Sequence, residues 1–441
     1  MRPLAFYCES FGCQMNAYDS EVISSLLEAE GHRAVDDPAA ADLIVLNTCS
    51  VRAHAEDRAI GRLHDLSRHR RASLVVCGCM AQRLGERLFE LVPGLRGIAG
   101  PSSYERLPAA LEESIETGGR FSLLESNGRA TYAFAGEPPR GGVSRYLAIT
   151  MGCDSYCAYC IVPYLRGAVR SKEPDTIIRE AVALAAAGAR EITLLGQNVI
   201  AYRSGGVEFL ELAARVLGET GVARLRFMTS HPKDMTERVF EAMANDGRLC
   251  PHIHLPVQAG SDRILGLMNR GYTREEYLAL LRRGRGLVPG LAVTTDVIVG
   301  FPTESEEDFG MTLDLVREVR FDAAFTFKYS RREGTAAAAM ADDVPLATKQ
   351  ERLRVLNDAV AAHRTDILRS QLGAETEILL DGVVKKGEHR WLKGRTPHFR
   401  NVVVAEGSAR VGEIVPVTLR HLVRFTFEGE IRPPRGPEVR A

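Results

Sequence analysis

The chain has 441 residues, of which 45% are hydrophobic and 26% charged, and its formal net charge is -1. This length corresponds to about three domains of about 150 residues each, and the composition is that of a globular protein. Because the net charge is small, the protein as a whole has no positive field that would attract nucleic acid. An RNA partner would therefore require a local basic patch. No apolar run reaches the about 20 residues of a membrane span and the first residues lack a signal-peptide layout, so we expect a cytoplasmic protein without a membrane partner.

The first part, residues 1–130, alternates apolar runs with helical patterns. Strands are predicted at 4–8, 43–47 and 74–77, and helices at about 16–30, 54–69 and 82–91. This order predicts a parallel, Rossmann-like α/β domain. Cys13, Cys49 and Cys79 each follow one of these strands, at the sheet edge where ligands bind in such folds.

Nine cysteines in a cytosolic chain indicate metal or redox chemistry, because disulfides are rare there. Cys13, Cys49 and Cys79 are either unrelated loop cysteines or three thiolate ligands of one centre. Their equivalent positions favour the second interpretation, an iron-sulfur cluster with one open iron. Cys8 and Cys77 inside strands, and Cys250 at the end of a helix, are predicted to be small buried hydrophobic side chains.

A Gly/Pro-rich stretch at 136–142 marks a boundary, and a second cysteine triad follows it in GCDSYCAYC, residues 152–160. Cys153, Cys157 and Cys160 are spaced as metal ligands. A structural zinc site needs a fourth ligand, yet the next Cys or His is His231. A 4Fe-4S cluster with one open iron is therefore favoured over an unusual zinc site or a chance grouping of buried cysteines.

The region 138–370 carries six strand-then-helix units, with strands near 146–149, 191–195, 224–228, 252–255, 291–297 and 323–327. Six parallel strands predict an open, partial TIM barrel, whose catalytic groups belong at the carboxyl ends of the strands. The second cysteine triad follows the first strand. Gln197, Ser230 and Gln258 follow later strands and are predicted cofactor contacts from that position alone.

The C-terminal region, residues 372–436, follows a charged helix at about 349–372. Five short strands at 376–380, 391–394, 401–405, 414–420 and 425–430 predict a small, OB-like β-barrel. Its basic and aromatic residues form either a solvated face or an RNA-binding surface, because cations suit phosphates and aromatic rings stack on unpaired bases. These residues are Lys385, Lys386, Arg390, Trp391, Lys393, Arg395, Phe399 and Arg400.

Several motifs resemble one known family. The C-x3-C-x2-C spacing with Tyr159 before the last cysteine resembles the radical S-adenosylmethionine (SAM) superfamily. FGCQMN at 11–16, NTCSVR at 47–52 and GCMAQ at 78–82 resemble the N-terminal domain of its methylthiotransferases. LGQN at 195–198, TSHP at 229–232, HLPVQ at 254–258 and DVIVGFP at 296–302 are similar to the tRNA-modifying branch of that family. GRT at 394–396 resembles the TRAM domain of tRNA-modifying enzymes.

The resemblance implies an enzyme that inserts a methylthio group at C2 of N6-isopentenyladenosine 37 in the tRNA anticodon loop. It implies two SAM molecules, one as methyl donor and one as radical source, and two 4Fe-4S clusters. Cys153, Cys157 and Cys160 would hold the radical cluster, and Cys13, Cys49 and Cys79 an auxiliary cluster that carries the sulfur. A reductant such as flavodoxin or ferredoxin is a further expected partner, and nothing in the pattern requires assembly beyond a monomer.

Three other functions fit parts of this pattern. Two are methylthiolation of threonylcarbamoyladenosine in tRNA and of an aspartate in a ribosomal protein, which use the same machinery on another target. The third is a non-catalytic iron-sulfur protein that binds RNA and senses redox state. Such a sensor would release no 5'-deoxyadenosine from SAM.

Overall fold

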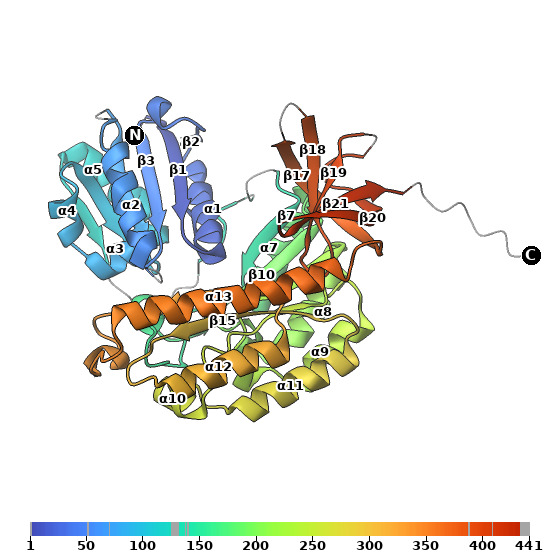
Figure 1. Cartoon of the computed structure of the whole chain (residues 1–441). Helices are drawn as coiled ribbons and strands as arrows, with labels where there is room; N and C mark the ends of the chain where they lie inside the picture. Colours follow the sequence, from blue (N-terminus) through green and yellow to red (C-terminus); the bar gives the residue numbers. More distant parts are fainter. Residues whose placement is uncertain are drawn as a thin grey trace, which may run out of the picture.

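The computed structural model describes residues 2–50, 53–69, 71–124, 132–136, 138, 141–386, 389–407 and 409–432, with the side chains of residues 53–55 and 386 excepted. Figure 1 shows an N-terminal α/β lobe and a C-terminal β-barrel side by side above a larger α/β lobe. The long helix α13 (Leu346–Arg369) crosses the larger lobe. In the described part of the chain, no helix is both long and apolar enough to span a membrane.

Parts of four predicted features lie outside the described residues. They are positions 51–52 of the second cysteine motif, 125–130 at the end of the predicted first domain, 137, 139 and 140 of the boundary stretch, and 433–436 at the end of the predicted third domain.

The N-terminal lobe is a six-stranded sheet whose paired strands all run parallel, in the order β2-β1-β3-β4-β5-β6. Alternate residues of its central strand face opposite sides: Val45 packs in the same core as Val22, while Leu46 packs with Leu63 and Met80. Helices therefore cover both faces, which confirms the predicted Rossmann-like fold. The strands are β1 (Ala5–Phe11), β2 (Arg33–Ala34), β3 (Leu43–Thr48), β4 (Ser73–Gly78), β5 (Leu95–Ala99) and β6 (Phe121–Leu123), and the helices are α1 (Gln14–Ala29), α2 (Ala53–Leu66), α3 (Cys79–Leu84), α4 (Arg87–Leu91) and α5 (Leu107–Thr117).

The larger lobe is the predicted open, partial barrel. Its six parallel strands form two groups, β7-β10-β13 and β14-β15-β16, and the Ser230 N-H donates to the His254 carbonyl across the junction at 3.2 Å. The strands are β7 (Ser144–Ala148), β10 (Glu191–Leu195), β13 (Arg224–Met228), β14 (His252–His254), β15 (Ala292–Val299) and β16 (Ala323–Lys328). The helices are α6 (Val162–Arg166), α7 (Pro174–Ala186), α8 (Phe209–Thr220), α9 (Glu237–Asn245), α10 (Asp262–Leu267), α11 (Arg274–Leu287), α12 (Glu306–Val319) and α13. Two short ribbons pair β8 (Thr150–Met151) with β9 (Arg170–Ser171) and β11 (Arg203–Ser204) with β12 (Val207–Glu208).

The C-terminal lobe is the predicted small β-barrel, and it is closed with its strands in the order β17-β18-β19-β21-β20. Its interior is apolar and includes Ile378, Leu392, Val402 and Phe427. The strands are β17 (Glu375–Lys386), β18 (His389–Arg395), β19 (Asn401–Ala405), β20 (Ile414–Val423) and β21 (Thr426–Ile431).

Three details of the predicted secondary structure are wrong. The single helix predicted at 82–91 is two helices, α3 and α4, because Gly85 between them adopts a positive φ of 56° that interrupts a helix. Cys79 begins α3 instead of lying in a loop. Cys250 does not end a helix: α9 stops at Asn245, and Cys250 lies buried in the connection to β14.

The C-terminal barrel docks on the amino ends of the larger barrel's strands. The Arg226 guanidinium donates two hydrogen bonds, of 2.9 and 2.7 Å, to carbonyls in the turn between β18 and β19. Arg224 donates a third hydrogen bond, to the carbonyl of Arg395 at the end of β18, at 2.6 Å. The Phe399 ring stacks on His252 with the ring centroids 4.7 Å apart. The C-terminal barrel is thus fixed to the end of the strands opposite to the loops that carry the second cysteine triad.

Acid is expected to weaken this interface. Burial and the nearby Arg226 charge lower the pKa of His252 well below its ordinary value, and burial followed by the Arg400 charge lowers that of His398 to about 4. Both imidazoles are therefore neutral when docked, but each takes up a proton near pH 6.5 once exposed. The contribution of these histidines to the free energy of unfolding is therefore fully present above that pH. It falls as the pH drops below it, by up to about 1.4 kcal/mol per pH unit for each histidine.

Thermal unfolding at pH 7.5 and 5.5 measures this effect. The His252→Phe variant keeps a ring against Phe399 but has no group to protonate, so its melting temperature should fall less between the two pH values than that of the parent. An equal fall in both proteins would show that His252 does not contribute.

Candidate active site

The first triad lies at the carboxyl ends of three adjacent strands. Cys13 follows β1 and caps α1, Cys49 follows β3, and Cys79 begins α3 directly after β4. Cys49 and Cys79 are each 4% exposed, whereas Cys13 is exposed. A Cβ placed on Gly12, whose φ is 151°, would come within 2.5 Å of the Cys49 Cβ. Glycine at this position therefore allows the Cys13 loop to approach Cys49 closely.

The electrostatics favour thiolate at Cys13, whereas burial raises the pKa of Cys79 above its ordinary value. A hydrogen bond with Cys49 and the positive charge of Arg166 lower the pKa of Cys13 to about 6. Among the described residues, no three His, Cys, Asp or Glu side chains converge on one point as ligands of a single metal ion would. An iron-sulfur cluster binds each thiolate through a different iron, so its ligands stand further apart. The donor set of three cysteines at one sheet edge fits such a cluster with one open iron.

Arg166 connects this triad to the second one. It ends α6, six residues after Cys160, and its Nε donates to the Cys79 sulfur at 3.3 Å. Its Nη2 donates to Asp19 at 2.6 Å. Arg166 is 4% exposed and Asp19 is fully buried. Burial alone lowers the pKa of Arg166, but the charges of Asp19 and Cys79 outweigh it and hold that pKa well above its ordinary value.

The second triad lies in the loop between β8 and α6. The Cys160 N-H donates to the Cys157 carbonyl at 2.9 Å, which holds the end of the loop in a turn. The Arg270 Nη1 donates to the Cys157 sulfur at 3.2 Å. Burial, followed by the charges of Cys157 and Cys153, raises the pKa of Cys160 to about 12. Three thiolates this close repel one another, and binding to cationic iron removes that repulsion.

The backbone of this loop is held from outside. Tyr156 has a positive φ of 43°, which is unusual for a residue with a side chain. The Asn269 side chain donates to the Tyr156 carbonyl at 3.1 Å and so stabilises that conformation. Strained backbone that the surrounding structure holds in place is concentrated at functional sites.

Polar atoms without partners surround the carboxyl ends of the barrel strands. Within the described residues, the buried Oγ1 of Thr150, Oε1 of Gln197, Oγ of Ser230, Nε2 of His231 and the hydroxyl of Tyr329 have no hydrogen-bond partner. Leaving such a group unsatisfied costs about 1–3 kcal/mol. Five of them at one end of the barrel are suited to a polar ligand such as the amino-acid and ribose groups of SAM.

Two of the three predicted cofactor contacts, Gln197 and Ser230, belong to this set. Gln258 differs from these two residues. Its backbone has a φ of 73°, and both of its backbone polar groups bond to β15: its N-H donates to the Asp296 carbonyl and its carbonyl accepts from the Ile298 N-H, each at 2.9 Å. Burial, with the positive charges of Arg270 and Lys233, lowers the pKa of His231 to about 2, so this imidazole is neutral. A neutral imidazole can accept a hydrogen bond.

The predicted RNA-binding residues fall into two groups. Arg395 pairs with Asp381 at 2.8 Å, Arg400 with Asp322 at 3.0 Å, and Phe399 stacks on His252. These three side chains are thus engaged within the protein. Lys385, Lys393 and Arg390 are exposed, and Trp391 is half-buried. The side chain of Lys386 lies outside the described residues.

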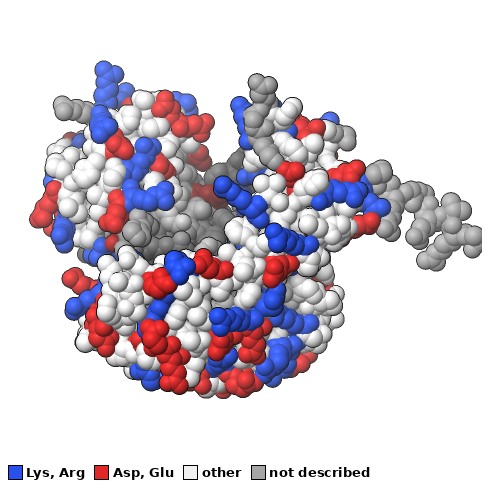
Figure 2. Space-filling view, viewed as in Figure 1, with Lys and Arg blue, Asp and Glu red and all other residues white. Residues whose placement is uncertain are grey.

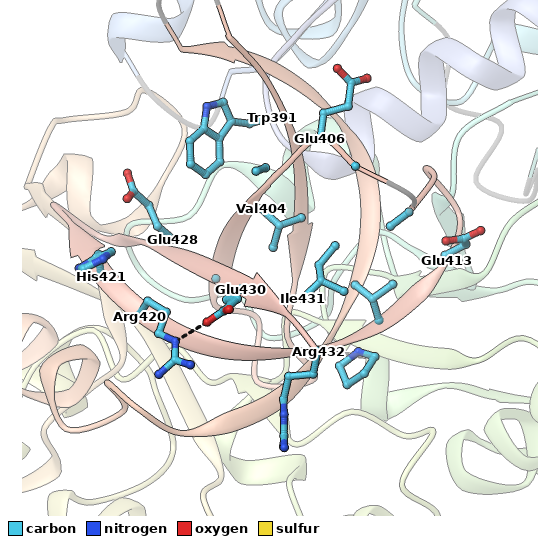
Figure 3. Close-up of a pocket in the computed structure, with 16 residues that line it drawn as sticks. Trp391, Val404, Glu406, Glu413, Arg420, His421, Glu428, Glu430, Ile431 and Arg432 are labelled. Atoms are coloured by element: carbon cyan, nitrogen blue, oxygen red, sulfur yellow. Dashed lines mark hydrogen bonds and ion pairs between the residues drawn. The ribbon is translucent and has the colours of Figure 1, made fainter. Parts of the chain in front are cut away.

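A cavity of about 700 Å³ opens beside Trp391 on the C-terminal barrel, as Figure 3 shows. Its charged lining is mainly acidic: Glu406, Glu413, Glu428 and Glu430 oppose Arg420 and Arg432. Arg420 pairs with Glu430 at 2.7 Å, and Arg432 pairs with Glu375. This cavity does not suit phosphate. The predicted cations left for an RNA backbone are Lys385 and Lys393, together with Arg390 once its exposed pair with Glu406 at 3.4 Å opens. None of these three lines the cavity.

Charges of both signs are mixed over the face of the molecule seen in Figure 2. That distribution agrees with the formal net charge of -1. No broad basic field covers this face, so RNA contacts there depend on local groups of Lys and Arg.

Sequence reasoning missed Asp19, Arg166 and Arg270. A charged residue is normally exposed, and nothing near these positions in the sequence marks them as buried. One local signal exists for Arg166: it lies in a short turn between Pro163 and Gly167 directly after the second triad. Only the fold brings it to Asp19, 147 residues earlier in the chain.

Two family models match the chain. One is described as "Uncharacterized protein family UPF0004" and matches residues 5–100, and the other is the radical SAM superfamily, which matches residues 147–316. A "tRNA-2-methylthio-N(6)-dimethylallyladenosine synthase" of Syntrophomonas wolfei is 42% identical, covering 98% of each chain. A protein of the same name from Syntrophus aciditrophicus is 41% identical over 96% of this chain and 94% of its own.

Solved structures support the fold. The radical SAM methyltransferase TsrM from Kitasatospora setae, with cobalamin and a 4Fe-4S cluster bound, superposes with a TM-score of 0.58 at 16% identity. The match covers 76% of this chain and 74% of that one. At this identity the likeness concerns the fold alone, an α/β domain joined to a partial barrel.

Proposed function

The chain belongs to the family of tRNA-2-methylthio-N(6)-dimethylallyladenosine synthases, and we propose that it adds a methylthio group at C2 of N6-isopentenyladenosine 37 in the tRNA anticodon loop. The observation that carries the proposal is full-length similarity, 42% over 98% of the chain, in a protein whose fold delivers two cysteine triads to the ends of two parallel sheets. It is a radical SAM enzyme of the transferase class.

Each triad holds one 4Fe-4S cluster in this proposal. Cys153, Cys157 and Cys160 bind the cluster that takes SAM, and Cys13, Cys49 and Cys79 bind the auxiliary cluster. When bound, these groups supply the electron, the radical, the methyl group and the sulfur of the reaction. The protein supplies position: the buried polar atoms of Gln197, Ser230 and His231 face the carboxyl ends of the strands and bind the polar parts of SAM. Gln258 is the third proposed cofactor contact, and its position is fixed by the backbone hydrogen bonds that it makes to β15.

The tRNA has to reach the site from the C-terminal barrel. That barrel is docked at the amino ends of the strands, whereas the second cysteine triad lies at their carboxyl ends. The RNA therefore has to extend along the strands, and the five residues of β10 span about 17 Å from one end to the other. Lys385, Arg390 and Lys393 bind phosphates, and Trp391 stacks on an unpaired base. The target adenine is unstacked from the loop, which costs little in single-stranded RNA. A reductant such as flavodoxin or ferredoxin, a cytoplasmic location and a monomeric state complete the proposal.

Nucleoside mass spectrometry of bulk tRNA tests this function. Cells that lack the protein should contain N6-isopentenyladenosine without the methylthio group, and the full chain should restore it. A methylthio gain on threonylcarbamoyladenosine instead would assign the other tRNA substrate. No change in any tRNA nucleoside would contradict a tRNA substrate altogether.

The RNA contacts are tested by salt dependence. The Lys393→Ala variant should bind every tRNA less tightly, by about the same factor for each. The slope of log affinity against log salt should be smaller by about 1, because one phosphate contact is lost. Arg317→Ala on α12, where the parent side chain is 60% exposed, is the matched control and should leave the slope unchanged. Equal slopes for Lys393→Ala and the parent would exclude Lys393 from the interface.

A further inference from the structure

Arg166 places the segment after the second triad in direct contact with the first. Ile161 and Leu165 of this segment pack with Cys79 in one small buried cluster. Arg166, at the end of α6, then donates its Nε hydrogen bond to the Cys79 sulfur at 3.3 Å. A residue from the radical SAM part of the chain is thus the polar partner of a cysteine in the N-terminal lobe.

All three nitrogens of the guanidinium have different partners. Besides Cys79, Nη2 donates to Asp19 at 2.6 Å and Nη1 to the Tyr132 hydroxyl at 3.2 Å. Asp19 is held in turn by hydroxyl donors from Tyr132 and Tyr104, the latter at 3.3 Å. The planar fork of arginine can satisfy three partners at fixed angles, which a lysine ammonium cannot do in the same way. The side chain is therefore held rigidly against Cys79.

We propose that Arg166 is a positioning residue that sets the redox behaviour of the auxiliary centre, by donating a charge-assisted hydrogen bond to the Cys79 thiolate. This inference rests on the proposed function, because it requires a cluster on Cys13, Cys49 and Cys79. Reduction adds negative charge to a cluster, and hydrogen bonds to its sulfurs are among the factors that set its potential. A cation held at 3.3 Å from a ligand sulfur, with 4% exposure, stabilises the reduced form with little screening by solvent.

The second triad has its own arginine. Arg270 donates to the Cys157 sulfur at 3.2 Å and is 4% exposed. Its other hydrogen bonds, to the Pro256 carbonyl, Tyr272 and Tyr159, lie within the larger lobe. Arg166 and Arg270 are thus separate, one for each triad, so their effects on the two clusters can be separated by experiment.

The test uses full-length protein in which Cys153, Cys157 and Cys160 are replaced by alanine, so that only the auxiliary triad can hold iron. Its reduction potential is measured by electron paramagnetic resonance during a redox titration. Arg166→Gln should shift the midpoint potential to more negative values. Arg145→Gln is the matched control: Arg145 is also 4% exposed and pairs with Glu21 of α1 at 2.9 Å, but it has no hydrogen bond to a cysteine among its described contacts. It should leave the potential unchanged.

A second variant keeps the inference testable if unpaired Asp19 prevents Arg166→Gln from folding. Arg166→Gln with Asp19→Asn removes both charges, and its potential should shift in the same direction but less, because the negative charge of Asp19 is lost too. An unchanged potential with normal iron content in either variant would overturn the role of Arg166 and leave the cluster in place. No iron in the parent protein would overturn both the auxiliary cluster and this role.

Discussion

The Cys157→Ala variant is expected to release no 5'-deoxyadenosine from SAM and to transfer no methylthio group, both at the background seen without protein. Cys157 lies at the centre of the C-x3-C-x2-C loop, with its sulfur 3.2 Å from Arg270. Its loss removes one of three thiolates, and two ligands do not retain a cluster with a single open iron. Without that cluster no electron reaches SAM, so the loss is complete instead of partial.

This result is measured with anaerobically reconstituted protein and dithionite, by chromatography of 5'-deoxyadenosine. Cys250→Ala is the control. Cys250 is 1% exposed and lies before β14, at the amino end of the strands. Its replacement by alanine costs about 1 kcal/mol of stability, and the variant should release 5'-deoxyadenosine at the parent rate. A Cys157→Ala protein that still released 5'-deoxyadenosine at the parent rate would contradict the assignment of this triad to SAM cleavage.

The strands with the clearest sequence pattern were predicted with the bounds that the structure has. β10, β13 and β19 agree residue for residue with the prediction. All five residues of β10 and of β13 are buried, and in both strands polar residues alternate with apolar ones, which is the pattern expected of a strand. The three-residue β6 was not predicted, because Phe121–Leu123 is too short to form a recognisable pattern.

Contacts between distant parts of the chain could not be predicted. Phe399 among basic residues is typical of an RNA-stacking surface, yet it stacks on His252. Arg226 and Arg224 lie inside the predicted strand 224–228, and nothing in its pattern indicates that they hold the C-terminal barrel. The periodicity of apolar residues in the sequence indicates which residues are buried, whereas the partner of a buried charge depends on tertiary structure. The loops that carry Cys13, Cys49 and Cys79 are the exception, since parallel strands bring the loops that follow them to one edge in any α/β sheet.

The Cys49→Ala variant should separate the two chemical steps that the two triads carry. Cys49 is 4% exposed and stands between Cys13 and Cys79 at the end of the central strand β3. Its removal should abolish methylthio insertion while 5'-deoxyadenosine release continues, because the triad after β8 is intact. Iron content should fall from about eight to about four atoms per chain, as expected for the loss of one of two 4Fe-4S clusters.

Cys77→Ala is the matched control, because Cys77 is fully buried in β4, two residues before Cys79, and packs in the apolar core of the same sheet. It should keep both activities and the full iron content at a small cost in stability. If Cys49→Ala still inserted the methylthio group, the sulfur would have to come from somewhere other than this triad. If instead it lost 5'-deoxyadenosine release as well, the two centres would depend on each other, and the contact between Arg166 and Cys79 would be the physical link through which they do so.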